Sequence, residues 1–162
     1  MTKRTKIGDV IEIPTSKGLT YVQYTHRHSE PPVFGDLIRV LQGFYEKRPS
    51  RKELEEIVKK PHRFSTFFPV KYTVARNIFE NVGHFEIPEF AQKFPTFKNA
   101  TGLKVKFDPD EANWWLWDGE KEWKVGKLSR EEQMKYPELA VYNDTGLIHA
   151  IETGKTQGRD LC

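Results

Sequence analysis

The chain has 162 residues, of which 37% are hydrophobic, 13% aromatic and 30% charged. This length and this share of large apolar side chains predict one compact domain with its own core, and they exclude a disordered chain. Apart from Lys3, Arg4 and Lys6, the chain carries 23 basic and 23 acidic residues. That balance argues against a nucleic-acid-binding protein with a strongly basic surface.

Membrane insertion and secretion are not indicated either. No run approaches the ~18 consecutive apolar residues that a membrane span needs, and no apolar stretch follows the basic start. We therefore expect a cytoplasmic protein with no membrane partner. Its single cysteine, Cys162, is the last residue, so no internal disulfide is expected.

Short apolar or alternating runs, interrupted by ten prolines and eleven glycines, predict a chain rich in β-strands. The first two runs flank a turn at Thr15–Gly18 and are typical of a hairpin. Pro69, inside the fourth run, indicates a sheet edge or a bulge. The predicted strands are Asp9–Ile13, Leu19–Thr25, Asp36–Leu41, Phe67–Val74, Gly83–Ile87, Leu103–Phe107, Trp114–Trp117, Glu122–Leu128, Leu139–Tyr142 and Leu147–Glu152.

Two helices are predicted from capping boxes, in which a serine and a glutamate three residues later cap the helix start reciprocally. The first box begins at Ser50 and precedes an apolar stripe at i, i+3, i+4 spacing. That stripe consists of Leu54, Ile57 and Val58. The second box begins at Ser129, with Met134 as its apolar anchor. Phe90 and Phe94, spaced i, i+4, predict one further helical turn.

Many short strands with turns between them predict a mainly β (α+β) fold, in which a small, bent, barrel-like antiparallel sheet is accompanied by one or two short helices. A doubly wound α/β fold would need helices between most strands. We predict a single domain over 1–162. Within it we expect a basic disordered tail at 1–6, a β core at 7–107, C-terminal strands at 108–153 and a flexible tail at 154–162.

His26 and His28 are the first candidates for metal ligands. Their i, i+2 spacing on a strand places both side chains on one face, as in pairs that share a metal ion. A working site needs further ligands, and the spacing of the remaining histidines and acids selects none. We therefore predict no catalytic residues, no metal and no cofactor, except a divalent metal at His26 and His28 if the protein is a hydrolase.

An acidic segment rich in tryptophan is the best candidate for a binding surface. Between residues 108 and 122 six acids stand against Lys121. Trp115 and Trp117 share one strand face and Trp114 takes the other, so one face belongs to the core and the other is free to meet a basic protein partner. Alternatively, the tryptophans are core and the acids solubilise a turn. The candidate partner-binding residues are Asp108, Asp110, Glu111, Trp114, Trp115, Trp117 and Asp118.

An opposite patch lies between Lys47 and Arg63, where seven basic residues stand against three acids. A phosphate or nucleic-acid site is one interpretation of this patch. A solvated helix face is favoured, because lysine and glutamate commonly alternate on exposed helices.

The order of several segments resembles the immunity protein 26 family of bacterial polymorphic-toxin systems. The matching segments are "GDVIEIP", "LTYVQY", "GDLIRVL", "FPVKYTV" and "GHFEIPEF…FPTF", from about Gly8 to Phe97, with a weaker echo in "LAVYNDTGLIHAIETG". His84 and Phe85 stand where the family often has Arg-Trp. The resemblance implies a protein that binds and neutralises a cognate toxin, which requires a shaped, charged surface and no catalytic constellation.

The same sequence group is also labelled as a phosphotriesterase of the HocA type, which implies a different function. We therefore predict an immunity-type protein that neutralises its toxin by stoichiometric occlusion. The alternative is a small phosphotriesterase-like hydrolase of organophosphate esters. The well-understood enzymes of that name are large α/β barrels of typically ~250 residues, and this chain is too short and too rich in strands for such a barrel.

Overall fold

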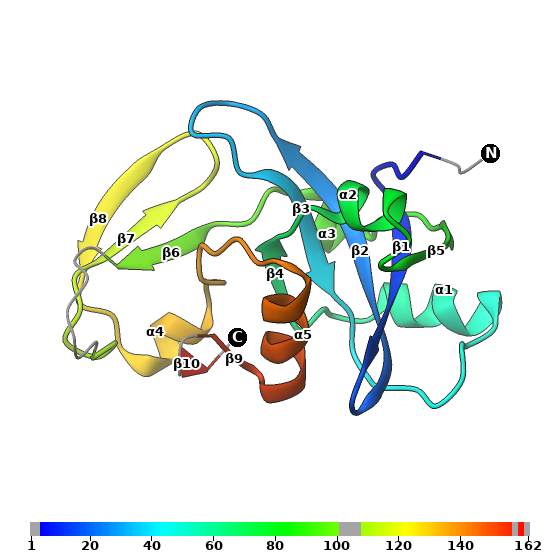
Figure 1. Ribbon diagram of the computed structural model, residues 1–162. Helices are drawn as coiled ribbons and strands as arrows, with labels where there is room; N and C mark the ends of the chain where they lie inside the picture. Colours follow the sequence, from blue (N-terminus) through cyan, green and yellow to red (C-terminus); the bar gives the residue numbers. More distant parts are fainter. Residues whose placement is uncertain (1–3, 101–107, 157–158, 161–162) are drawn as a thin grey trace.

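The computed structural model describes residues 4–100, 108–156 and 159–160, and two antiparallel sheets dominate it, at the right and left of Figure 1. The larger sheet has five strands in the order β4-β3-β2-β1-β5. Their bounds are β1 Asp9–Thr15, β2 Gly18–His28, β3 Gly35–Val40, β4 Phe64–Phe67 and β5 Glu80–His84. The predicted mainly β fold with antiparallel sheets and short helices is confirmed, and neither of these two sheets closes into a barrel within the described residues.

Five short helices accompany the sheets within the described residues, more than the one or two that we predicted. They are α1 Arg51–Lys59, α2 Val70–Ala75, α3 Glu89–Gln92, α4 Arg130–Met134 and α5 Asp144–Thr153. Both predicted capping boxes are present, at Ser50 and at Ser129. The anchor of the second helix is not Met134, which is exposed, but Gln133, which is buried.

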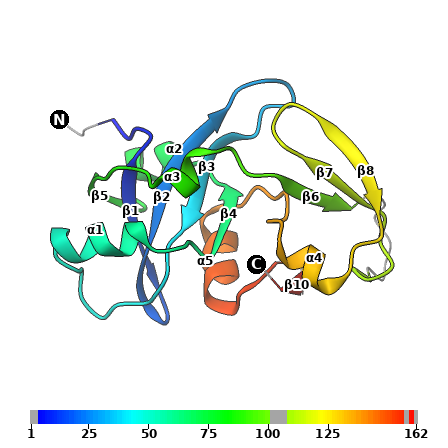
Figure 2. The same cartoon turned by 180° about the vertical axis from the view of Figure 1, so that it is seen from behind.

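Both faces of the larger sheet are covered, which explains why five consecutive residues of β1 are buried. On one face, Ile11 and Val22 pack with apolar side chains of α2 and α5. On the other face, Val10 and Tyr21 pack with the apolar stripe of α1. Figures 1 and 2, seen from opposite sides, place α5 beside β4 and α3 beside β2. The sheet is therefore the middle layer of the larger part of the molecule.

Two segments predicted as strands are helices. The run Phe67–Val74 leaves the sheet at Phe67 and becomes α2, with Pro69 at its N-terminal cap rather than at a sheet edge. A proline is favoured at a helix start because its fixed φ fits and its missing N–H costs nothing there. Val70 and Val74, spaced i, i+4, then face the core.

The predicted strand Leu147–Glu152 lies within α5. Asn143 caps this helix, because its Oδ1 accepts a hydrogen bond from the N–H of Gly146 at 2.7 Å. Gly154 ends it in the left-handed region, at φ 69°. The buried side chains of α5 are Leu147, Ala150 and Ile151. The region 108–153, which we predicted as C-terminal strands, therefore consists of strands followed by two helices.

The smaller sheet has three strands in the order β6-β7-β8, and a two-stranded sheet β9-β10 lies near the C-terminus. Their bounds are β6 Phe97–Ala100, β7 Trp114–Trp117, β8 Glu122–Gly126, β9 Lys155–Thr156 and β10 Arg159–Asp160. The predicted strand Leu139–Tyr142 contributes only a parallel bridge between Val141 and Phe67. The predicted strand at Gly83–Ile87 begins and ends three residues earlier, as β5. The prediction at Leu103–Phe107 lies outside the described residues.

Two further observations concern the predicted tails and the membrane. Thr5 is buried, and the N–H of Lys6 donates to Asp9 Oδ2 at 3.0 Å, so residues 5 and 6 contact the folded domain. None of the helices in the described part of the chain is long and apolar enough to cross a bilayer.

We expect Asn143→Ala to destabilise the protein by about 1 kcal/mol, because the first turn of α5 loses its side-chain cap. For a chain of this length the melting temperature should fall by about 2–4 °C in a thermal unfolding experiment. Thr145→Ala is the matched control, since it removes a hydroxyl from the same turn but leaves the N–H of Gly146 paired. Equal effects of the two substitutions would contradict the assigned cap.

Candidate functional site

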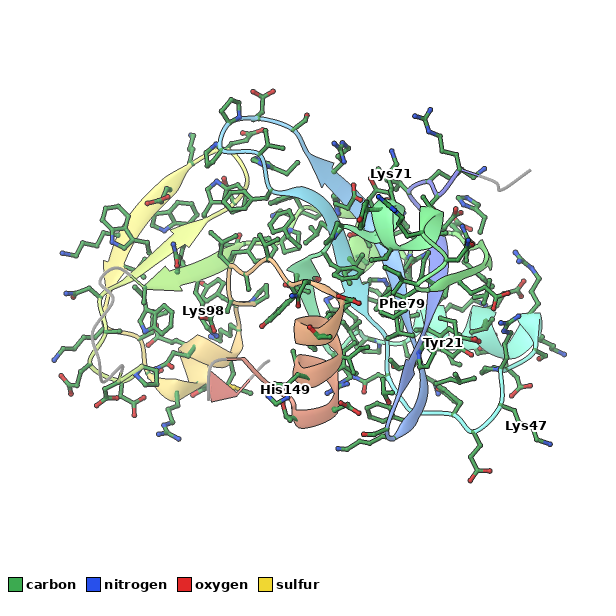
Figure 3. The ribbon with its side chains drawn as sticks, in the orientation of Figure 1. Tyr21, Lys47, Lys71, Phe79, Lys98 and His149 are labelled. Carbon is green, nitrogen blue, oxygen red and sulfur yellow. The ribbon has the colours of Figure 1, made fainter. Side chains whose placement is uncertain are left out.

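The three predicted tryptophans occupy different environments. Trp114 is 0% exposed, its Nε1 donates to the carbonyl of Pro109 at 2.9 Å, and the ammonium of Lys98 lies 5.9 Å from its ring centroid. Lys98 itself is buried between β6 and α4, where it donates to the carbonyls of Gln133 and Tyr136 (Figure 3). Trp114 is therefore part of the core and has no surface to offer a partner.

Trp115 and Trp117 are both partly buried and alternate with the buried Trp114 and Leu116, as predicted. Trp117 belongs to an aromatic cluster at the junction of the two sheets. Its ring centroid lies 4.9 Å from that of His28 and 5.0 Å from that of Phe34. Much of its surface thus packs internally, and the free area of this strand is smaller than the sequence suggested.

Trp123 is the tryptophan that the sequence analysis missed. It lies on β8, the edge strand of the smaller sheet, opposite Leu116, and is 39% exposed, the largest exposure of any described tryptophan. Val125 on the same strand is also exposed. Every residue of Glu122–Val125 is exposed, and no strand pairs with the outer side of β8 in the described part of the chain, features that the sequence alone does not reveal.

The acids of the predicted surface divide into two groups. Asp110 accepts from Arg130 at 3.3 Å, and Glu111 pairs with Lys127 at 2.7 Å, so neighbouring cations offset both charges. Asp108 is exposed and caps its own turn. The remaining group is the β7–β8 turn.

Asp118 organises this turn. Its Oδ1 accepts from the backbone N–H groups of Lys121 and Glu120 at 2.8 and 2.9 Å, and these bonds hold the pKa of Asp118 below its ordinary value. Glu120 and Glu122 are exposed and form no ion pair within the described residues. The unneutralised acidic charge therefore lies beside Trp123, at the turn end of the hairpin.

His26 and His28 share a face, as their spacing predicted, and both rings pack against Phe94. They do not form a metal site in the geometry seen. His26 Nε2 lies 2.7 Å from the carbonyl of Gln92, and His28 Nδ1 accepts from the N–H of Phe34. Within the described residues no three His, Cys, Asp or Glu side chains are placed to hold one ion.

An Asp–His pair that the sequence analysis did not select lies in a cleft of about 860 Å³ beside β5. His84 Nδ1 lies 2.9 Å from Asp9 Oδ1, while Asp9 Oδ2 accepts from Asn81 Nδ2 at 2.8 Å. The carboxylate is buried and the imidazole is half-exposed. Because Nδ1 faces the carboxylate, Nε2 of His84 is the ring nitrogen left for proton exchange with the cleft.

Gly8 explains how the His84 ring lies so close to the backbone. A Cβ atom at Gly8 would lie 2.4 Å from His84 Cε1, and the φ of Gly8 is +103°, so no other residue fits there without displacing the ring. The antiparallel pairing of β1 with β5 joins Asp9 and His84 across 75 positions of sequence. No spacing pattern in the sequence reveals such a pair.

An ion-pair network closes the wall of this cleft. Glu12 accepts from Arg48 Nε at 2.7 Å, and the same guanidinium reaches Glu80 at 2.6 Å. The hydrogen bond from Arg48 holds the pKa of Glu12 below 4.5, and burial together with Glu12 raises the pKa of Tyr21, which donates to that carboxylate at 2.8 Å. Arg48 belongs to the basic segment Lys47–Arg63, so part of that segment is structural.

A second cleft, of about 800 Å³, lies at the β3–α2 junction and is lined by Arg27, Asp36, Lys71, Tyr72 and Val141. Asp36 is buried and engaged with Arg27 at 2.7 Å and with the hydroxyl of Tyr24 at 2.8 Å. Burial and this bond raise the pKa of Tyr24 to about 12. Lys71, labelled on α2 in Figure 3, also lines this cleft. Because Arg27 and Asp36 offset each other, Lys71 gives the cleft a net positive charge.

Comparisons of the chain with protein-family models, with curated proteins and with solved structures find no match. The resemblance to the immunity protein 26 family therefore stays a prediction that rests on the matching segments.

We expect Arg48→Met to lower the free energy of unfolding by about 1–3 kcal/mol at pH 7, because the buried carboxylate of Glu12 loses its charged donor. The folded state lowers the pKa of Glu12, so this contribution is complete above pH 4.5 and is lost as the pH falls through the lowered value. Urea unfolding at pH 7 and pH 3 measures the difference.

Lys59→Met is the matched control, because it removes an exposed cation whose pair with Glu56, at 3.4 Å, should contribute little. A loss of stability that is the same at both pH values for Arg48→Met would contradict the linkage to Glu12.

Proposed function

We propose that this chain is an immunity-type binding protein that neutralises a cognate bacterial toxin by stoichiometric occlusion. The observation that carries the proposal is the exposed Trp123 on the edge strand β8, beside the unpaired carboxylates of Glu120 and Glu122. Exposed tryptophan is the residue most enriched among binding hot spots, and adjacent acids favour encounter with a basic partner.

The position of Trp123 on an edge strand supports the same proposal. Within the described residues no strand pairs with the outer side of β8, so its backbone N–H and C=O groups are open to a strand of a partner. Trp123 and Val125, two residues apart, share one face of β8, and both are exposed. A strand of a toxin paired here would bury the indole and place its own basic side chains against Glu120 and Glu122.

Co-expression with the toxin domain encoded beside its gene tests the proposal. We expect the chain to restore growth and to form a complex of defined stoichiometry in size-exclusion chromatography. Restored growth without a complex would contradict occlusion, and neither growth nor a complex would contradict the immunity function.

Glu120→Lys combined with Glu122→Lys should slow association with that toxin by about tenfold at low salt and remove most of the salt dependence, because electrostatic attraction accelerates encounter. Stopped-flow fluorescence of Trp123 measures the rate. Glu46→Lys with Glu86→Lys is the matched control, since it makes the same change in net charge at exposed positions outside β8, one between β3 and α1 and one after β5. Equal rates for the two double variants would contradict the contact assigned to the turn.

Trp123→Ala should instead increase the dissociation rate, with a loss of binding free energy of about 2 kcal/mol or more if the indole is buried by the partner. The thermal stability of the free protein should change little, since this indole is exposed. Val125→Ala is the control, since it truncates an exposed apolar side chain on the same strand and leaves the indole in place. Trp114→Phe would not serve, because Trp114 is in the core.

A hydrolase is the second candidate function, and the Asp9–His84 pair is the observation that favours it. The imidazole is oriented by a buried carboxylate and fixed against Gly8, as expected of a general base. His84 Nε2 would take a proton from water, the water oxygen would bond to phosphorus, and the ester bond would break as the leaving alkoxide takes up a proton. His84→Gln should abolish hydrolysis of a phosphotriester, whereas the exposed His149→Gln should not. Turnover that survives His84→Gln would contradict this site.

A further inference from the structure

A buried arginine without an acidic partner lies beneath α3. Arg39, on β3, is 0% exposed. Its Nε donates to Gln23 Oε1 at 2.9 Å and its Nη2 to the carbonyl of Val58 at 2.6 Å, both of which are uncharged acceptors. Nη1 is buried and has no hydrogen-bond partner within the described residues. A buried guanidinium in this state is costly, because neither its charge nor its full set of donors is satisfied.

His62 presents a second unsatisfied nitrogen at the same place. Its Nδ1 is buried and has no partner among the described residues, although part of the side chain reaches the surface. Burial and the positive charge of Arg39 lower the pKa of His62 to about 4, so the ring is neutral at pH 7 and lies within the field of the guanidinium. Two potential donors, close enough for the charge of Arg39 to act on His62, thus lack an acceptor among the described residues.

Phe90 of α3 covers both side chains. Its ring centroid lies 5.6 Å from Cζ of Arg39 and 6.1 Å from the centroid of His62. Phe90 is 53% exposed, so one aromatic side chain separates the buried nitrogens from solvent. At the last residue of the same helix, the carbonyl of Gln92 holds His26 through Nε2, and His26 Nδ1 is buried with no partner among the described residues.

The cover itself is slight. α3 has four residues, of which Ala91 alone is buried. It lies on the same face of the larger sheet as α1 (Figure 2). A single turn of this kind can be displaced without breaking the sheet, since its own backbone bonds are few.

We propose that Arg39 and His62, beneath Phe90 of α3, form a binding site for a small oxyanion, a phosphate or a carboxylate group. Its oxygens accept hydrogen bonds from Arg39 Nη1 and from the Nδ1–H tautomer of His62, and Phe90 closes over it. An oxyanion suits the site because it only accepts hydrogen bonds and supplies the missing negative charge. A water molecule would satisfy the donors but leave the charge of Arg39 uncompensated. This site is separate from β8 and from the Asp9–His84 cleft.

Thermal unfolding of the full chain at pH 7 provides the first test, in 50 mM sodium phosphate, in sodium acetate and in sodium chloride of the same ionic strength. A dissociation constant of about 5 mM for phosphate corresponds to a rise in melting temperature of about 3–6 °C over chloride. Arg39→Met should remove this rise. Arg63→Met should keep it, because Arg63 is also a largely buried arginine with an unpartnered Nη1 but contacts Phe44 and Phe64 instead.

Titration of the unmodified protein with phosphate, followed by the ring resonances of His62 in NMR spectra, gives a second test that does not depend on a variant folding. The proposal expects a saturable shift for His62 that is absent for the exposed His149. Saturation by phosphate alone assigns a phosphate group, and saturation by acetate alone assigns a carboxylate. A linear response to both salts, or an increase in stability that Arg39→Met and Arg63→Met retain equally, would overturn the proposal.

Discussion

The buried hydrogen bond between Gln23 and Arg39 is the contact on which the larger half of the molecule depends. Gln23 Nε2 donates to the carbonyls of Gly8 and Phe85 at 3.2 and 3.0 Å, and Arg39 extends the chain to the carbonyl of Val58. One pair of side chains therefore links β2 and β3 to the end of α1, to the start of β1 and to the residue after β5. Because both side chains are fully buried, water cannot replace a lost partner.

The same network explains why two candidate sites lie where they do. It holds Gly8, on which the ring of His84 rests, and thereby sets the geometry of the Asp9–His84 pair. It also engages two of the three guanidinium nitrogens of Arg39 and leaves Nη1 without a partner among the described residues. A buried polar network favours one arrangement of the surrounding strands, because a network with unsatisfied hydrogen-bond groups costs more free energy than an apolar core.

The smaller sheet is attached to the larger one mainly by aromatic rings. Phe67 on β4, Phe97 on β6 and Trp117 on β7 meet in one cluster, with centroid distances of 5.3 to 6.1 Å between them. His28, which was predicted as a metal ligand only for the hydrolase alternative, is a member of this cluster and packs against Trp117. Since Trp117 packs in this cluster, the surface that we propose for the partner lies on the edge strand β8 instead.

Features that depend on residues close together in the sequence could be predicted, and features that depend on distant residues could not. The capping boxes at Ser50 and Ser129 were recognisable because a cap is complete within four residues. The strand at Trp114–Trp117 was predicted with its bounds, whereas Val70–Ala75 and α5 were mistaken for strands. A short apolar run fits the periodicity of a helix as well as that of a strand. Pro69 and Asn143, which begin these two helices, are the residues that distinguish a helix from a strand here. The Asp9–His84 pair and the unpaired Nη1 of Arg39 arise only from strand pairing and burial, which no spacing reveals.

The three candidate sites also differ in how independent they are. The β8 edge shares no hydrogen-bond partner with the other two, since its contacts are to β7 and its turn is closed by Asp118. Effects at separated sites of this kind add, so binding by β8 can be tested without disturbing the larger sheet. The cleft at His84 and the space beneath α3, by contrast, are joined through Gln23, which bonds to Gly8 on one side and to Arg39 on the other. A change in either should therefore affect the other, whereas the β8 edge can be varied without disturbing the Gln23–Arg39 network.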